Sequence, residues 1–283
     1  MIDLALDAAA GLLETGSNVA GVYEFESRIL TVEPVMGDSV LITVAVSREL
    51  AERLRAGHFF DILCRIDGSS DPLLRRPYSV FRVDAAAGTM TFLVRSFGRG
   101  SAWLTERRAD DTLNLLGPLG NSYTILPRSR HLLMVAGGVG VAPLVMLTDE
   151  AIRRGLDVTY LMGSLNESGL LSPSLLPSAV EYVVATNDGS KGHRGFVTDL
   201  VPGYVDSHWA DQLFSCGPEP MYRSLRAAVL PHRIGKTPTV QVSMERTMAC
   251  GVGACLGCVV ETRHGMQTSC VEGPVFDMDE IVW

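Results

Sequence analysis

Cys250-Gly-Val-Gly-Ala-Cys255-Leu-Gly-Cys258, followed by Cys270, is the stretch around which the C-terminal part of the chain must fold. Four, two and eleven residues separate its four thiols. With this spacing, one loop can wrap around an inorganic centre while a distant thiol closes it. The glycines at 251, 253 and 257 can take positive φ and bring backbone N–H groups close to the sulfur atoms. We therefore predict that Cys250, Cys255, Cys258 and Cys270 are the ligands of a metal centre.

The kind of centre follows from the first three cysteines. Their C-x4-C-x2-C run is the spacing of plant-type [2Fe–2S] proteins. Structural zinc is the stronger alternative, although zinc sites usually present two separate cysteine pairs, whereas here the last cysteine stands alone. Disulfides are the weaker alternative, because a chain of this length can form a hydrophobic core without covalent cross-links. The spacing favours a [2Fe–2S] cluster and leaves zinc open.

The composition of the whole chain excludes several classes of protein. Its 283 residues and 47% hydrophobic content suit two domains and a small appendage. A net charge of −8 argues against a nucleic-acid-binding protein, which needs a basic face. The N-terminus carries acids where a signal peptide carries Lys or Arg, and no apolar run reaches about 18 residues. We expect a cytoplasmic protein that does not act at a membrane and keeps its cysteines reduced.

The first half of the chain has the pattern of a small antiparallel β-barrel. Residues 1–20 form an extension, whose first fourteen residues have the pattern of a short amphipathic helix. Between residues 21 and 125, short runs of alternating or β-branched residues are separated by glycine-containing turns. The expected strands are 28–35, 39–46, 59–66, 78–83 and 89–95.

Two motifs in this barrel indicate a cofactor site. Arg75-Arg76-Pro77-Tyr78-Ser79 lies at a strand start, where a guanidinium binds phosphate, a ring covers a planar group and a hydroxyl reaches its heteroatoms. Alone, such a run is more often a turn that leads into an edge strand. Phe97-Gly-Arg-Gly100-Ser101 precedes a helix-like segment, whose free N–H groups suit a pyrophosphate. The second motif therefore strengthens the first.

The order of these motifs, with Gly117-Pro-Leu-Gly120 at the barrel exit, resembles the FAD domain of the ferredoxin–NADP reductase superfamily. The resemblance implies that Arg76 contacts the phosphates of FAD, that Tyr78 packs near the isoalloxazine and that Ser79 approaches its N5 edge. It also implies that Gly100 and Ser101 hold the pyrophosphate. The remaining residues implied at the cofactor are Pro77, Leu93, Val94 and Arg95.

Residues 126–238 have the strand–helix alternation of a doubly wound parallel sheet. A buried strand over 131–136 leads through Gly137-Gly-Val-Gly-Val-Ala-Pro143 into a helix over 144–154. Strand, glycine turn and helix form a phosphate-binding unit, although this pattern differs from the usual G-x-G-x-x-G. Further strands are expected at 157–162, 181–186 and 211–215. The candidate NAD-binding residues are Gly137, Gly138, Gly140 and Pro143, with tight packing as the alternative role of the glycines.

Two later turns follow strands, at the edge where ligands bind in such sheets. Cys216-Gly217-Pro218 resembles the reductase superfamily, in which this cysteine stands close to nicotinamide and flavin. The resemblance implies that Cys216 and Ser79 are the catalytic residues and that Gly217 adjoins the nucleotide. The alternative is a small buried thiol, the role that we expect for Cys64.

The preference between NAD and NADP depends on charge near the adenosine ribose. A 2′-hydroxyl suits a carboxylate, whereas a 2′-phosphate suits arginines. The segments 163–167 and 186–188 contain Glu167 and Asp188 and no arginine, which favours NAD. Lys191 and Arg194 lie close enough in sequence to weaken this prediction.

The three parts together are typical of an electron-transfer protein, because a flavin exchanges hydride with nicotinamide and single electrons with iron–sulfur clusters. The whole arrangement, and Met244-Glu-Arg-Thr-Met-Ala-Cys250 above all, resembles the electron-transfer subunits of NAD-dependent dihydroorotate dehydrogenases. That resemblance implies FAD, a [2Fe–2S] cluster in a domain over 239–283, and NAD as a diffusible substrate. It also implies an FMN-containing catalytic partner that oxidises dihydroorotate to orotate in pyrimidine biosynthesis, within a heterotetramer.

Alternatives from two classes stay open at this point. Subunits with the same layout serve sulfide dehydrogenases, hydrogenases and bifurcating transhydrogenases, and we find no pyrimidine site in the sequence. The non-enzymatic alternative is a redox-sensing or zinc-containing scaffold protein. The identity of the final substrate therefore depends on the partner.

Overall fold

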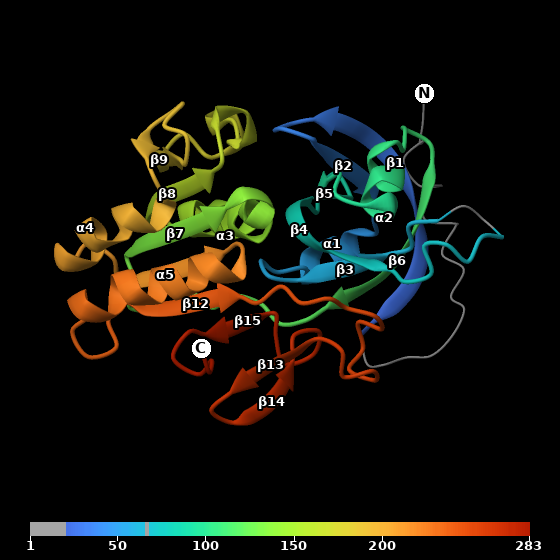
Figure 1. Cartoon of the computed structure of the whole chain (residues 1–283). Coiled ribbons are helices and arrows are strands. Elements are labelled where there is room, and N and C mark those ends of the chain that lie inside the picture. The colour runs from blue at the N-terminus through green and yellow to red at the C-terminus, as the bar shows by residue number, and fades with distance from the viewer. Residues whose placement is uncertain (1–20, 66–67) are drawn as a thin grey trace.

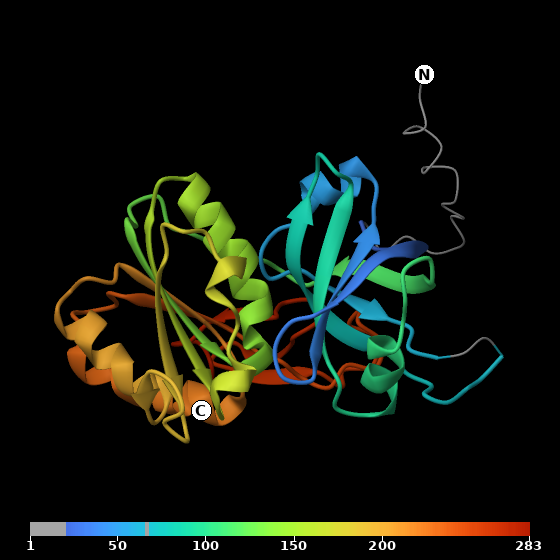
Figure 2. The ribbon, with the colours of Figure 1, turned by 90° about the horizontal axis from the view of Figure 1, so that it is seen from above.

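A computed structural model describes residues 21–65 and 68–283, so the predicted N-terminal extension lies outside the described residues. The described chain forms a closed barrel, a seven-stranded sheet and a two-stranded hairpin. Figures 1 and 2 show the barrel beside the sheet, and Figure 1 shows the C-terminal segment running below both. The predicted fold class is confirmed. None of the helices in the described ranges is long and apolar enough to cross a membrane.

Six antiparallel strands close the barrel in the order β1-β2-β5-β4-β3-β6. They are β1 (Tyr23–Pro34), β2 (Ser39–Ala45), β3 (Phe59–Ile62), β4 (Arg76–Asp84), β5 (Thr89–Arg95) and β6 (Thr112–Leu119). Strand β6 is not among the strands predicted above, and it includes Gly117 and Pro118 of the predicted barrel exit. At Gly117, an added Cβ would overlap the ring of Phe60. Two short helices, α1 (Arg48–Arg53) and α2 (Arg99–Thr105), complete this part.

The second sheet has the order β10-β9-β8-β7-β11-β12-β15 and is parallel except for β15. Its strands are β7 (His131–Gly137), β8 (Asp157–Ser164), β9 (Glu181–Thr186), β10 (His193–Arg194), β11 (Gln212–Cys216), β12 (Thr239–Ser243) and β15 (Val275–Asp277). The helices are α3 (Val141–Arg153), α4 (Val201–Asp206) and α5 (Glu219–Val229). The short 3-10 turns are η2 (Gly138–Gly140), η3 (Glu167–Gly169), η4 (Pro173–Leu175), η5 (Val197–Leu200) and η6 (Leu230–His232). The central strand β7 is apolar and almost wholly buried, as expected for a parallel sheet covered on both faces.

The sheet continues past the domain boundary predicted after residue 238. Strands β12 and β15 both come from the segment 239–283, yet they form one edge of this sheet. Their antiparallel pairing joins Val242 to Phe276. The hairpin of β13 (Val259–Thr262) and β14 (Gly265–Thr268) lies outside the sheet, as does the cysteine loop before it. The cysteine segment is therefore tied to the second sheet at both of its ends.

The barrel and the sheet share an apolar core. Phe81 and Leu93 of the barrel are buried in the same cluster as Cys216. At the edge of this core, Arg82 of β4 donates to both carboxylate oxygens of Asp149 on α3, at 2.7 and 3.2 Å. Its Nη2 also donates to the carbonyl oxygen of Leu175 at 2.8 Å. A bidentate pair of this kind fixes direction as well as distance, so it helps to orient the barrel on the sheet.

Candidate functional site

Arg76 lies beside the first turn of α2, so the structure brings the two barrel motifs together. A Cβ built on Gly100 would lie 3.4 Å from Nε of Arg76 and 3.4 Å from Cβ of Cys64. Nη1 of Arg76 donates to the carbonyl oxygens of Leu74 (2.7 Å) and Arg75 (3.1 Å). These are the hydrogen bonds that the guanidinium makes within the described part of the chain. Its other donors remain available to an anion beside the helix start.

The hydroxyl of Ser101 is already used within the turn. Its Oγ accepts from the N–H groups of Phe97 and Gly98, at 2.8 and 2.9 Å, and donates to the carbonyl oxygen of Gly98 at 3.0 Å. These three hydrogen bonds shape the loop that precedes α2. A pyrophosphate at this place would therefore meet the backbone of Ser101 rather than its side chain.

The half-buried side chains of Tyr78 and Ser79 lie on β4 next to β3. Tyr78 is paired with Phe60, and Ser79 is paired with Phe59. Burial raises the pKa of Tyr78, so its hydroxyl stays neutral and can donate a hydrogen bond. Pro77 precedes them and is paired with Asp61.

The predicted contacts on β5 are of two kinds. Leu93 and Val94 are 5% and 0% exposed and belong to hydrophobic cores, so a cofactor would meet their backbone rather than their side chains. Arg95 at the end of the strand is exposed. Of these three residues, Arg95 alone offers its side chain to a ligand.

Close packing explains several glycines at the ends of β7 and β11. A Cβ on Gly140 would overlap the carbonyl oxygen of Cys216, and one on Gly217 would lie 2.5 Å from Cε of Met221. A Cβ on Gly137 would lie 2.7 Å from Sδ of the same methionine. Gly138 differs, because its φ is +55° and no atom lies within 4 Å of an added Cβ. Its backbone is open to a ligand, whereas Pro143 is buried in the first turn of α3.

Cys216 pairs with a carboxyl group that the motifs did not predict. Its fully buried Sγ lies 3.6 Å from Oε1 of Glu245, which follows β12. Burial raises the pKa of both groups, so both favour the protonated form. Glu245 as a whole residue is nevertheless exposed to solvent. The parallel pairing of Cys216 with Ser243 explains why the two residues meet.

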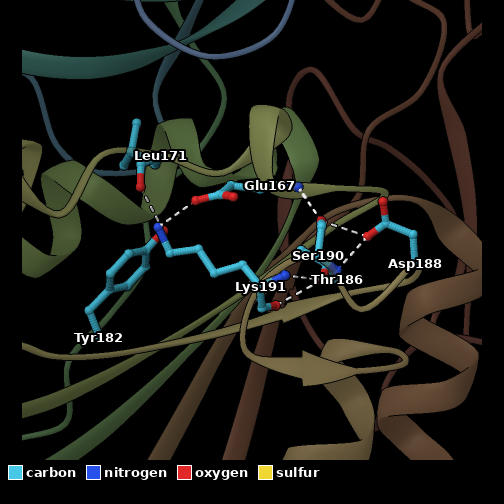
Figure 3. A network of polar contacts seen from close by, with 7 residues as sticks. All are labelled: Glu167, Leu171, Tyr182, Thr186, Asp188, Ser190 and Lys191. Carbon is cyan, nitrogen blue, oxygen red and sulfur yellow. Dashed lines mark hydrogen bonds and ion pairs between the residues drawn. The ribbon is translucent and has the colours of Figure 1, made fainter.

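Asp188 lies in the exposed turn after β9 and is held by its own loop. Its Oδ1 accepts from Oγ of Ser190 at 2.6 Å and from its N–H at 2.9 Å, and these bonds lower the pKa of Asp188. Lys191 follows in the same turn, and its Nζ lies 2.9 Å from Oε1 of Glu167 (Figure 3). The structure therefore places both predicted acids and the neighbouring lysine at one edge of the sheet.

Backbone N–H groups donate to three of the four cysteines in the C-terminal segment, Cys250, Cys255 and Cys270. Sγ of Cys250 accepts from the N–H of Cys255 at 3.4 Å, and Sγ of Cys270 accepts from that of Gly253 at 3.2 Å. Sγ of Cys255 accepts from the N–H of Gly257 at 3.4 Å in the same way. Burial raises the pKa of Cys250, but nearby N–H groups outweigh it and bring the value to about 7.

The number of cysteines suits an iron–sulfur cluster. A [2Fe–2S] cluster is held by four cysteines shared between two irons. The C-terminal loop and the hairpin after it offer four, of which Cys258 and Cys270 are buried and Cys255 is exposed.

The loop conformation partly follows the predicted glycine pattern. Gly251 and Gly253 have φ of 70° and 77°, but Leu256, at 53°, takes positive φ in place of Gly257. The N–H of Gly257 instead donates to Sγ of Cys255 at 3.4 Å. Gly251 is also required for packing, because a Cβ there would overlap Oδ2 of Asp61.

Strand β3 lies between the barrel motif and the cysteines. Phe59, the strand partner of Ser79, is buried in one cluster with Cys258 and Cys270. Asn121, just after the barrel, binds the strand β15 that follows the cysteines. Its Oδ1 accepts from the N–H of Val275 at 2.9 Å, and its Nδ2 donates to the carbonyl oxygen of Val275 at 2.8 Å. One strand therefore separates the predicted flavin site from the predicted cluster.

Comparison with known proteins agrees with this geometry. Residues 245–282 match the iron–sulfur cluster binding domain of dihydroorotate dehydrogenase B. Over 246 residues, the chain is 37% identical to the dihydroorotate dehydrogenase B (NAD(+)) electron transfer subunit of Bacillus caldolyticus, covering 84% of this chain and 91% of that one. The chain belongs to this family of electron transfer subunits. The Desulforamulus reducens member is 33% identical over 265 residues, covering 92% and 98% of the two chains.

Solved structures of other proteins share the fold of this chain. The NADH-dependent reduced ferredoxin–NADP oxidoreductase, a flavin-based electron-bifurcating enzyme, is 25% identical, with a TM-score of 0.80 over 91% of this chain and 90% of that one. A ferredoxin–NADP+ reductase of Neisseria gonorrhoeae shares the fold at 18% identity, with a TM-score of 0.62 over 77% and 98% of the two chains. These similarities confirm the resemblance to the reductase superfamily that the motifs indicated.

Replacing Asp61 with asparagine is expected to make the stability of this family member less dependent on pH. Asp61 is 1% exposed, and burial raises its pKa to about 6 against the opposing charge of Arg75. Among the described residues, its Oδ1 has no hydrogen-bond partner. Because the native state binds this proton more tightly than the unfolded chain does, the stabilisation is complete below about pH 4 and is lost as the pH rises through 6.

The loss in the wild type amounts to about 3 kcal/mol by pH 8. Denaturant unfolding at pH 5 and pH 8 should therefore show Asp61→Asn gaining stability over the wild type at the higher pH. The exposed Asp38 provides the matched control Asp38→Asn. An equal difference between Asp61→Asn and the wild type at both pH values would contradict the assignment.

Proposed function

We propose that this chain is the electron transfer subunit of an NAD-dependent dihydroorotate dehydrogenase, which passes electrons from the FMN of a catalytic partner to NAD+ in pyrimidine biosynthesis. The observation that carries the proposal is the position of β3, with Ser79 on the neighbouring strand and Cys258 and Cys270 packed on Phe59. When bound, FAD exchanges a hydride with nicotinamide and single electrons with an iron–sulfur cluster. Short distances between such groups are what electron transfer requires.

The residues of the barrel fit FAD. Arg76 and the backbone at Gly100 and Ser101 offer positive charge and N–H donors to the phosphates. Tyr78 and Ser79 follow Arg76 on β4 and would lie beside the isoalloxazine ring of FAD. The remaining contacts of this proposed site are Pro77, the backbone of Leu93 and Val94, and the side chain of Arg95.

The residues of the sheet fit NAD at the carboxyl ends of its strands. Gly138 opens the turn after β7, and the neighbouring Gly137, Gly140 and Pro143 shape it. Cys216 and Gly217 would lie at the nicotinamide, and Asp188 would receive the adenosine ribose. We assign Ser79 and Cys216 as the catalytic residues. The contact between Glu245 and Cys216 keeps a protonated, buried thiol beside the nicotinamide position.

The cysteine loop fits a [2Fe–2S] cluster and an adjacent partner. Cys255 is exposed at the surface while Cys258 and Cys270 are buried against the barrel. Two exposed apolar side chains lie by this loop: Leu256 (65%) follows Cys255, and Val271 (51%) lies against Gly253. Such side chains suit burial in a protein interface. We therefore place the FMN-containing subunit against this loop, within a heterotetramer.

The second candidate is a subunit of an electron-bifurcating enzyme, which the similarity to the NADH-dependent reduced ferredoxin–NADP oxidoreductase favours. Purification of the complex from its native host distinguishes the two. We expect a co-purifying FMN subunit and reduction of orotate by NADH, with flavin and [2Fe–2S] absorbance that NADH bleaches. A hydrogenase or transhydrogenase partner would reject dihydroorotate oxidation, and a colourless protein with one zinc would reject electron transfer altogether.

A further inference from the structure

The turns that follow β8 and β9 carry a set of charges arranged around one lysine (Figure 3). Lys191 pairs with Glu167, and both side chains are more than half exposed, at 53% and 57%. The backbone of Lys191 is fixed at both ends, because Oγ1 of Thr186 accepts from its N–H at 3.0 Å and donates to its carbonyl oxygen at 2.8 Å. The end of β9 therefore fixes the backbone of Lys191, and the ion pair with Glu167 holds its ammonium group.

The loop that carries Glu167 is fixed as firmly. The N–H of Glu167 donates to Oγ of Ser190 at 2.8 Å, and the same Oγ donates to Oδ1 of Asp188. Further along this loop, the hydroxyl of Tyr182 donates to the carbonyl oxygen of Leu171 at 2.8 Å. Glu167, Asp188 and Lys191 are consequently linked through Ser190 and one ion pair.

This group lies where a dinucleotide would place its adenosine ribose. Strands β7, β8 and β9 are parallel neighbours, so the glycine turn after β7 and the turns after β8 and β9 share one edge of the sheet. In such units, the acid after the strand next to the glycine turn receives the ribose 2′-hydroxyl, whereas a cation there receives a 2′-phosphate. Glu167 follows β8, and Lys191 is the cation nearest to it.

We propose that Glu167 determines the preference for NAD(H) over NADP(H) by pairing with Lys191, which would otherwise attract a 2′-phosphate. Glu167 neutralises Lys191, and Asp188 remains as the carboxylate that accepts a hydroxyl and repels a phosphate. Arg194 lies against Gly189 in the same turn and carries a further positive charge at this edge. The inference rests on the proposed function, because it assumes that a dinucleotide binds at this edge. An exposed ion pair contributes little to stability, so Glu167 can be replaced without loss of the fold.

The test compares Glu167→Gln with the wild type in the complete complex. We expect the ratio of kcat/KM for NADPH to that for NADH to rise about tenfold through a lower KM for NADPH, because Lys191 gains a charge-assisted contact with the phosphate. Calorimetric titration with NADP+ and NAD+ should show the same shift in Kd, independently of turnover. The double variant Glu167→Gln/Lys191→Met should lose this gain.

The matched control is Glu52→Gln, which removes one negative charge from the ion pair with Arg48 on α1. It should leave the nucleotide preference unchanged. An unchanged ratio in Glu167→Gln, or a gain that persists in the double variant, would overturn the inference. If NADH neither binds nor reduces the flavin of the wild type, the proposed function fails instead, so the two failures are distinguishable.

Discussion

Cys255→Ser is expected to abolish orotate reduction by NADH in the complex while NADH still reduces FAD. Cys255 is the exposed thiol of the loop, so its replacement removes a proposed cluster ligand without opening the core that Cys258 and Cys270 fill. Removing even a residue that supports a metal ligand costs about 10- to 100-fold, so we expect the loss of a ligand to lower orotate reduction at least ~100-fold. Hydride transfer needs only the barrel and the sheet.

The measurement is a rapid-mixing experiment that follows the flavin bands with NADH and, separately, orotate reduction under steady-state conditions. Ala254→Ser is the matched control, because it introduces the same hydroxyl one residue away and keeps all four thiols. Loss of flavin reduction in Cys255→Ser, with a normal control, would show that the cluster loop also shapes the flavin site. Unchanged orotate reduction would exclude the loop from the electron path.

Local patterns in the sequence predict the parts of this fold that local forces determine. The cysteine spacing, the alternating strands and the glycine turn after β7 all depend on neighbouring residues. The edge of the second sheet does not, because β12 and β15 pair across the intervening cysteine loop and hairpin. A loop of that length leaves no periodic signal that links its two ends. This explains why the predicted boundary after residue 238 divides a continuous sheet.

The candidate site shows the same limit. The resemblance of Cys216-Gly217-Pro218 to the reductase superfamily indicates Cys216 but not Glu245, since the contact between them arises only when β12 pairs with β11. A lone glutamate before an arginine resembles an ordinary surface residue in sequence. Likewise, nothing in the pattern around Asp61 indicates burial beneath Gly251, because that contact joins the barrel to a loop near the other end of the chain.

Arg76→Ala is expected to weaken FAD binding by about 1.5–3 kcal/mol, or roughly 10- to 150-fold in affinity. Arg76 lies against Gly100 at the start of α2, and its Nη1 alone is engaged by carbonyl oxygens within the described residues. Its remaining donors are therefore available to a phosphate. Titration of the apoprotein with FAD, followed by flavin fluorescence, measures the change directly.

The preceding arginine provides the matched comparison. Arg75 pairs with Glu24 at 2.6 Å and donates to the carbonyl oxygens of Asp61 and Asn114, both at 3.3 Å, so it joins β4 to β1, β3 and β6. Arg75→Ala should therefore lower the melting temperature of the barrel more than its intrinsic affinity for FAD, whereas Arg76→Ala should do the reverse. If both variants lose FAD only in proportion to their loss of stability, the phosphate binds elsewhere. A separate loss of affinity in Arg76→Ala would assign the two adjacent guanidinium groups to different tasks, one to the cofactor and one to the barrel.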